Sequence, residues 1–458
     1  MSRFDIDPVD ASWIAFARIF VGVFWLYEVF LGGRWKLGTP GTGPNPDWVG
    51  PAAGGEIVEI GNEALADGTW TAVAFALETV ILPHAAFWAN LVTFSQLLFG
   101  ICMILGAFVR LTSIGALSQL GLVVAFGPAG VGPILMAGHL FALATDAGQH
   151  YGIDGWLSGR SASDPLSRLG ERLATTGHLP ERTLPGLAAG AGVIALYFLF
   201  TAVNHGGESI PTASLELGVL SGLAGFGFWL AYNGISGVSI GAEILRIFVG
   251  YRLLHEIFIS TDATLDKMPG WAAFAELGTT FEEITVEHFA VIGSLVDAAF
   301  LPAVEAWAVA FAVVQTAVGI ALLVGYRTRA ASALGIVYMG VLITLGFTRY
   351  TPFLFGLLIA MWALGGRHAS VDSAVGRIGI SPRLVRWDAP IAFSVAGVST
   401  LVAVSTGIAP DGYVSTMGPV VALMIAIFTA LVGLTALSHH RLPEIDRQET
   451  ANVRATSD

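Results

Sequence analysis

The sequence predicts an all-α, polytopic membrane protein with about twelve transmembrane helices. Three observations favour this fold class: the composition, the recurrence of long apolar runs, and the uneven placement of basic residues. Hydrophobic residues make up 54% of the 458 residues, charged residues only 12%, and the mean hydropathy is +0.71. Soluble domains carry about 25% charged residues, so this composition excludes an ordinary soluble enzyme.

Twelve segments are apolar enough to be membrane helices. A helix needs about 20 mostly apolar residues to cross a bilayer, and only helices or closed barrels satisfy the backbone there. The apolar runs are too long and continuous for barrel strands. The predicted spans are 13–31, 87–107, 113–127, 133–147, 186–203, 215–235, 241–260, 304–325, 330–348, 351–365, 390–408 and 419–437.

Loops and helix-ending residues separate the predicted spans. The first span follows MSRFDIDPVD, which lacks a basic region and a small-residue cleavage site, so we expect a retained anchor. A long loop, 32–86, separates it from spans two to four, and the loop 259–303 separates span seven from span eight in the same way. The other spans are bracketed by proline and glycine, which favour helix ends. These prolines are Pro128, Pro133, Pro185, Pro352 and Pro390.

The basic residues predict the orientation of the helices. With the N-terminus in the cytoplasm, 15 basic residues fall in cytoplasmic segments and four in outer segments. This asymmetry follows the positive-inside rule, so we expect a multi-pass protein of the cell (plasma) membrane with cytoplasmic N- and C-termini. The four outer residues are Arg34, Lys36, Lys267 and Arg349.

The two halves of the chain share three collinear blocks. RIFVG at 18–22 recurs at 246–250, an offset of 228, and Glu28 aligns with Glu256. GQHYGID, from Gly148, resembles GRHASVD, from Gly366. Six spans per half is an even number, so we expect two parallel six-helix repeats. The middle block, at an offset of 219, aligns Trp88, Gln96, Gly100, Gly106 and Arg110 with Trp307, Gln315, Gly319, Gly325 and Arg329.

The repeats predict the domain organisation. Each half has a four-helix unit, 1–184 with its cytoplasmic loop and 241–388, followed by a two-helix extension. The extensions are 185–240 and 389–437, and 438–458 is expected to be a polar cytoplasmic tail in which His439 and His440 are solvated. The large loops are acidic. Within them 281–301 looks amphipathic, which predicts a helix lying either on the membrane surface or packed on the bundle.

The repeated motifs resemble those of DoxX/DoxD-type membrane proteins. The resemblance rests on Arg18, Gly22 and Glu28, followed by GGRWKL with Lys36, and on the later glycine–glycine–arginine pattern. That family's unit is a four-helix membrane bundle, so the resemblance implies a tandem duplication with units at about 13–157 and 241–375. The second copy departs from the pattern, because it lacks the GxxK motif and Lys267 is displaced by three residues.

The resemblance implies a function near a quinone. Family members resemble the small subunits of thiosulfate:quinone oxidoreductase, so we expect a quinone-associated subunit, with a separate redox enzyme as a partner on the outer face. The only cysteine, Cys102, excludes an internal disulfide, a cysteine metal cage and a dithiol, and the sequence contains no metal or flavin motif. Whether the chain is itself an enzyme is left open by these residues.

The net charge of −12 argues against a nucleic-acid partner and leaves the lipid bilayer as the expected surroundings. Acid-rich, lysine-poor loops resemble the composition of proteins from archaeal halophiles.

Charges inside the spans are the main functional signal, because each is costly in lipid. Arg252 is expected near the centre of span 241–260, with Glu256 one turn later on the same helix face. Together with His255 they offer hydrogen-bond donors and a proton path for a quinone head group. The alternative is a structural ion pair between the repeats.

The remaining candidates are matched between the halves. Arg18 and Arg246 lie near the cytoplasmic ends of their spans, where they either bind a ligand or extend to lipid head groups. Gln96 and Gln315 either reach Glu28 and Glu256 or hydrogen-bond between helices. His139 is interpreted as an interior histidine with its hydrogen bonds satisfied rather than a haem ligand.

Two other functions remain open. Two parallel six-helix halves match the gross layout of major facilitator transporters, although the basic loop expected after the second helix is missing. A non-enzymatic membrane scaffold that uses the acidic outer loops is the other alternative.

Overall fold

The computed structural model describes residues 7–457 except 32–35, 38–42, 127–129, 160–178, 205–208, 259–273, 348–349, 378–379, 386 and 407–416. All regular secondary structure within these residues is helical. Each of the twelve apolar segments coincides with a helix. They are α1 (Pro8–Phe30), α4 (Ala85–Leu105), α5 (Val109–Ala125), α6 (Gly132–Ala144), α9 (Leu184–Asn204), α10 (Ser209–Tyr232), α11 (Gly237–Phe258), α14 (Val304–Val324), α15 (Thr328–Thr344), α16 (Thr351–Leu364), α18 (Asp388–Thr406) and α19 (Met417–Ser457).

Seven helices of the described chain are long and apolar enough to cross a membrane, which agrees with a polytopic membrane protein. They are α1, α4 with the turns before it, α9, α10, α14 with the turns before it, α18 and the first part of α19. Four more, α5, α6, α15 and α16, are apolar but shorter, and α11 carries four charged residues. The number twelve therefore stays a prediction.

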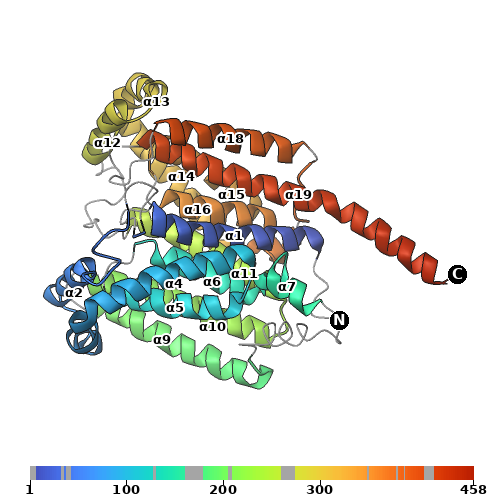
Figure 1. The fold of residues 1–458 in the computed structure, drawn as a ribbon, viewed down its shortest axis with the longest axis horizontal. Helices are drawn as coiled ribbons and strands as arrows, with labels where there is room; N and C mark the ends of the chain where they lie inside the picture. Colours follow the sequence, from blue (N-terminus) through green and yellow to red (C-terminus); the bar gives the residue numbers. More distant parts are fainter. Residues whose placement is uncertain are drawn as a thin grey trace.

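The helices form one elongated bundle with α1 near its middle (Figure 1). Helix α1 packs on α4, α6, α16 and α19, while α11 packs on α6, α10, α14 and α16. The hairpins α9–α10 and α18–α19 lie along opposite sides, and α9 and α18 are largely exposed apolar helices. The core consists of large side chains from the central helices, including Trp13, Phe20, Trp25, Phe248 and Phe353.

The two ends of the bundle differ. The short helices α2 (Gly55–Ala66), α12 (Phe274–Glu287) and α13 (Ala290–Leu295) lie at one end, which we call the loop-helix end. The start of α1 and the short α7 (Ile153–Ser158) lie at the other, the terminal end (Figure 1). The predicted amphipathic helix 281–301 is broken, because the amide of Phe289 donates 2.7 Å to His288 Nδ1 instead of continuing the helix.

Glycines set the closest helix crossings. A Cβ atom on Gly22 of α1 would lie 2.8 Å from the carbonyl oxygen of Gly100 in α4, so only glycine allows the two backbones to approach. Likewise, a Cβ atom on Gly250 of α11 would lie 2.9 Å from the carbonyl oxygen of Gly319 in α14. The glycines of the two crossings are equivalent in the alignment of the halves, because Gly22 aligns with Gly250 and Gly100 aligns with Gly319.

The helix ends nearby are also alike. Asp154 accepts hydrogen bonds from the amides of Phe108 and Val109, at 2.8 and 3.0 Å, where α5 begins. Asp372 accepts from Arg327 and Thr328, at 2.8 and 2.7 Å, where α15 begins. A carboxylate at a helix N-terminus satisfies amides that lack an intrahelical acceptor. The GQHYGID and GRHASVD segments thus cap the starts of α5 and α15, which precede them in the chain.

The C-terminal segment is helical, and one of its two histidines is not solvated as expected. Helix α19 continues through it to Ser457 and extends beyond the bundle (Figure 1). His439 is buried rather than solvated: its Nδ1 accepts from the amide of Leu384 at 3.1 Å, and its ring lies 5.8 Å from that of Trp13. Helix α19 therefore places His439 beside the start of α1, a contact that the sequence did not predict.

Candidate functional site

A buried group of charges lies between α10 and α11. The guanidinium of Arg252 contacts the carboxylates of Glu216, from α10, and Glu256, one turn later on α11 at 2.6 Å. Arg252 is 4% exposed and Glu216 is 0% exposed, whereas the Glu256 side chain is 23% exposed. The ion pair that the i, i+4 spacing predicts is therefore confirmed, and a second carboxylate joins it.

Uncharged polar groups surround these three charges. His255 Nδ1 lies 3.4 Å from Arg252 Nη1, and its Nε2 lies 3.6 Å from Glu216 Oε1. The Tyr251 side chain lies beside Glu216. The Tyr350 ring lies 5.7 Å from the guanidinium carbon of Arg252, a cation–π distance. We call Glu216, Tyr251, Arg252, His255 and Glu256 the Arg252 cluster.

The helical hairpin explains why Glu216 meets Arg252. Helix α10 ends at Tyr232 and α11 begins at Gly237, so the two are antiparallel neighbours joined by a short turn. Glu216 lies 16 residues before the end of α10 and Arg252 lies 15 residues after the start of α11. At about 1.5 Å per residue they are at the same level. Arg252 is six residues from the end of α11, nearer the loop-helix end than the predicted central position.

Five buried atoms of the Arg252 cluster lack a hydrogen bond of standard geometry to any described residue. They are Glu216 Oε2, the Tyr251 hydroxyl, Arg252 Nε, His255 Nε2 and Glu256 Oε1. Buried polar atoms are normally paired, so the cluster has hydrogen-bonding capacity that a ligand could use. The cluster can donate hydrogen bonds, accept them and exchange a proton.

Arg18 and Arg246 lie at the terminal end and do not extend to the surface, since each is 1% exposed. Arg18 donates to the carbonyls of Ala147, His150 and Tyr151, at 3.1 to 3.2 Å. Because both guanidinium groups are surrounded by protein atoms, lipid head groups are not their partners. Arg246 donates to Leu322, Leu323 and Ala369, at 2.5 to 2.7 Å, and pairs with Glu243.

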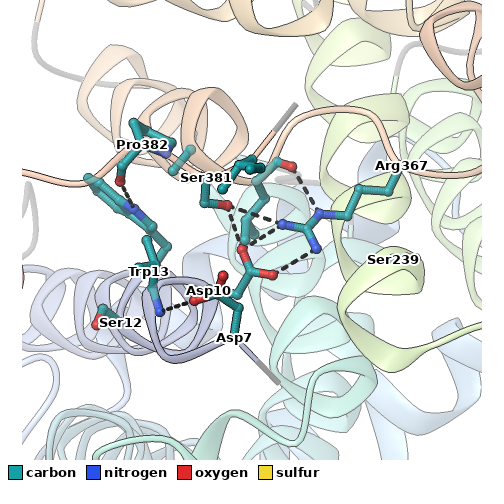
Figure 2. A network of polar contacts seen from close by, with 12 residues as sticks. Asp7, Asp10, Ser12, Trp13, Ser239, Arg367, Ser381 and Pro382 are labelled. Atoms are coloured by element: carbon teal, nitrogen blue, oxygen red, sulfur yellow. Dashed lines mark hydrogen bonds and ion pairs between the residues drawn. The ribbon is translucent and has the colours of Figure 1, made fainter. Parts of the chain in front are cut away.

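A polar network links Arg246, through Glu243, to the start of α1. Arg367, which follows α16, forms a two-pronged ion pair with Asp10 of α1, at 2.8 and 2.6 Å. Figure 2 shows Ser381 beside the same carboxylate, to which its hydroxyl donates at 2.5 Å. The backbone amides of Arg367 and His368 donate to Glu243, at 2.8 and 2.9 Å. Sequence reasoning missed Glu243 as well as Glu216, although Glu243 precedes Arg246 at i, i+3 spacing.

The matched glutamines hydrogen-bond between elements. Gln96 accepts from Lys36, which follows α1, and Gln315 donates to the Leu253 carbonyl at 3.0 Å and accepts from Tyr338 at 2.6 Å. Gln315 thus links α14 to α11 and α15, whereas Gln96 links α4 to the turn after α1. Glu28 is partly buried on α1, and Lys267 lies outside the described residues.

His139 has both ring nitrogens occupied. Trp25 Nε1 lies 2.8 Å from its Nε2, and Ser113 Oγ lies 3.1 Å from its Nδ1. This agrees with a satisfied interior histidine. Within the described residues, no group of three or more His, Cys, Asp or Glu side chains is arranged to hold a metal ion.

Comparisons with protein-family models, with curated proteins and with solved structures gave no match for this chain. The geometry of the residues described above is therefore the ground on which a function can be argued.

Proposed function

We propose that the chain crosses the membrane twelve times in two parallel, duplicated halves, with the terminal end in the cytoplasm. The paired glycine crossings and the paired caps by Asp154 and Asp372 support the duplication, because independent segments have no reason to share both. The concentration of arginine in the loops of the terminal end supports the orientation.

We further propose that this membrane protein is a quinone-associated, DoxX-like partner of a membrane oxidoreductase. The supporting observation is the Arg252 cluster, a buried group of charged and polar side chains in which five polar atoms lack a hydrogen bond of standard geometry to described residues. A quinone head group has two carbonyl oxygens that need donors, and its reduced form releases protons to a base. Arg252 and Tyr251 supply donors, while the partly exposed Glu256 supplies a base.

The test is to purify the full-length protein in mild detergent and measure co-extracted quinone per mole of protein. We expect quinone in the wild type and its loss in Arg252→Leu and in the gentler Arg252→Lys, which keeps the charge but not the planar fork. Arg110→Leu is the matched control, because Arg110 pairs with Asp146 outside the Arg252 cluster. Its quinone content should equal that of the wild type.

Absence of quinone from the wild type, together with no binding of an added short-chain benzoquinone, would refute the proposal. Equal quinone in the wild type and both Arg252 variants would refute the assignment to this cluster. Solute uptake by proteoliposomes without any bound quinone would favour the transporter alternative instead.

A further inference from the structure

We propose that the Arg252 cluster binds one exchangeable proton, held on the carboxyl group of Glu216. It would then be a proton-binding site inside the membrane-spanning part of the bundle. This inference goes beyond the proposed function, because it requires no quinone and concerns the resting protein.

The charge count is the first argument. Within the part of the chain that the structure describes, Glu216 and Glu256 share a single guanidinium, so the ionised cluster would carry one uncompensated negative charge. Glu216 is fully buried, and an isolated ionised carboxylate in an apolar interior is so costly that it takes up a proton instead. Glu256 is partly exposed and keeps its 2.6 Å ion pair with Arg252, so Glu216 is the group that takes the proton.

A second buried pair in the same chain has a fuller set of hydrogen-bond donors. Among the described residues, Glu243 shares Arg246 with no other carboxylate, and it accepts from Arg246 Nε at 2.8 Å and from two backbone amides. Both of its oxygens have donors. Glu216 instead shares Arg252 with Glu256, and among the described residues it accepts from no backbone amide. A proton on the Glu216 carboxyl group compensates for this smaller set of donors.

His255 is the other group that could hold the proton, and its position argues against this. Its Nδ1 lies 3.4 Å from Arg252 Nη1, which always carries hydrogen and positive charge. Nδ1 must therefore present its lone pair to the arginine, and a doubly protonated ring would place an N–H against a cation. The imidazole is thus neutral, with its hydrogen on Nε2, toward Glu216 Oε1 at 3.6 Å.

The other groups that face the site leave the charge count unchanged. Among the described residues, Tyr251 and Tyr350 are the remaining titratable residues that interact with Glu216 or Arg252, and a neutral tyrosine contributes no charge. A metal ion is a poorer occupant than a proton, because the described residues contain no group of three ligating side chains arranged for one.

Infrared spectroscopy of the quinone-free protein in liposomes tests this directly. A protonated carboxylic acid has a carbonyl band that ionised carboxylates lack and that shifts in D2O. Exposed glutamates are ionised at pH 7, so we expect one such band at that pH in the wild type and its loss in Glu216→Gln. Glu243→Gln, which removes a glutamate with a full set of donors, should keep the band.

Glu256→Gln provides a second, independent variant at a partly exposed position. It leaves one arginine for one glutamate, so Glu216 should ionise and the band should disappear although Glu216 is still present. Circular dichroism checks that each variant is folded. The proposal is overturned if the wild type has no such band, if the band persists in either Glu216→Gln or Glu256→Gln, or if added Na⁺ at constant pH removes it, which would identify a cation site.

The two proposals fail separately. If the protein shows the band but never binds quinone, only the proposed function is refuted. If it binds quinone at Arg252 but shows no band, only the proton-binding site is refuted.

Discussion

Asp10 and Arg367 form a two-pronged ion pair between residues 357 positions apart in the sequence. The pair joins the first turn of α1 to the segment after α16, and the same segment holds Glu243 of α11 through two backbone amides. One short stretch of chain thus ties three central helices together at the terminal end.

Breaking this pair should lower stability through a specific coupling. The side chains of Arg367 and Asp10 are only 18% and 12% exposed, so we expect a coupling of about 1–2 kcal/mol in a double-mutant cycle of Asp10→Asn and Arg367→Gln. Thermal unfolding in detergent would measure it. A cycle with Asp388→Asn in place of Asp10→Asn should be additive, and additivity in both cycles would show that the pair contributes nothing.

The glycine crossings should not accept even a methyl group. Gly22→Ala and Gly250→Ala place a Cβ within 3 Å of backbone atoms of the facing helix, so each should cost about 1–3 kcal/mol of unfolding free energy. Gly121→Ala, on α5, is the matched control, because a Cβ there meets nothing within 4 Å. Equal melting temperatures for all three variants would contradict the close approach.

The two capping aspartates should behave alike. Asp154→Ala and Asp372→Ala each remove two hydrogen bonds at a helix start, and we expect each to lower the unfolding free energy by about 1–2 kcal/mol. The replacements Asp154→Asn and Asp372→Asn should recover part of the loss, since an amide oxygen still accepts. A large loss at one position and none at the other would show that the two caps are not equivalent.

His150 should make stability depend on pH. Burial lowers the pKa of its imidazole, which lies outside the membrane-spanning helices and whose Nε2 is 3.2 Å from the Thr145 carbonyl. The unfolded chain therefore binds a proton first, at a pKa of about 6.5. The free energy of unfolding should fall as the pH drops below that value toward the folded-state pKa.

Melting temperatures measured between about pH 7.5 and pH 5 would test this linkage. The loss at low pH should be smaller in His150→Gln than in the wild type. Exposed His84→Gln should match the wild type, and an identical loss in all three proteins would show that His150 is not responsible.

The sequence predicted the positions of the apolar helices well, because each depends on local composition. It also predicted the Arg252–Glu256 pair, which depends on the period of a single helix. It missed Glu216 because that contact joins two helices, and its only local signal is one acid in an apolar run. Once the end of α10 and the start of α11 are known, counting 16 and 15 residues away from the turn places Glu216 and Arg252 at the same level.

Side-chain direction was harder to predict than helix position. Arg18 and Arg246 were expected either to extend to lipid head groups or to bind a ligand, yet they bind backbone carbonyls of loops that are distant in sequence. The break at Phe289 likewise arises from a hydrogen bond to the preceding histidine, which the apolar pattern cannot encode.

The Asp10–Arg367 pair also bears on how the molecule is made. Arg367 leaves the ribosome 357 residues after Asp10, once the helices from α1 to α16 have been synthesised. Until then the carboxylate has no guanidinium to neutralise it, and α1 cannot adopt its final attachment to α16 and α11. Assembly of the terminal end must therefore be a late event in biogenesis, so truncated chains that stop before residue 367 should be the ones that cellular quality control removes.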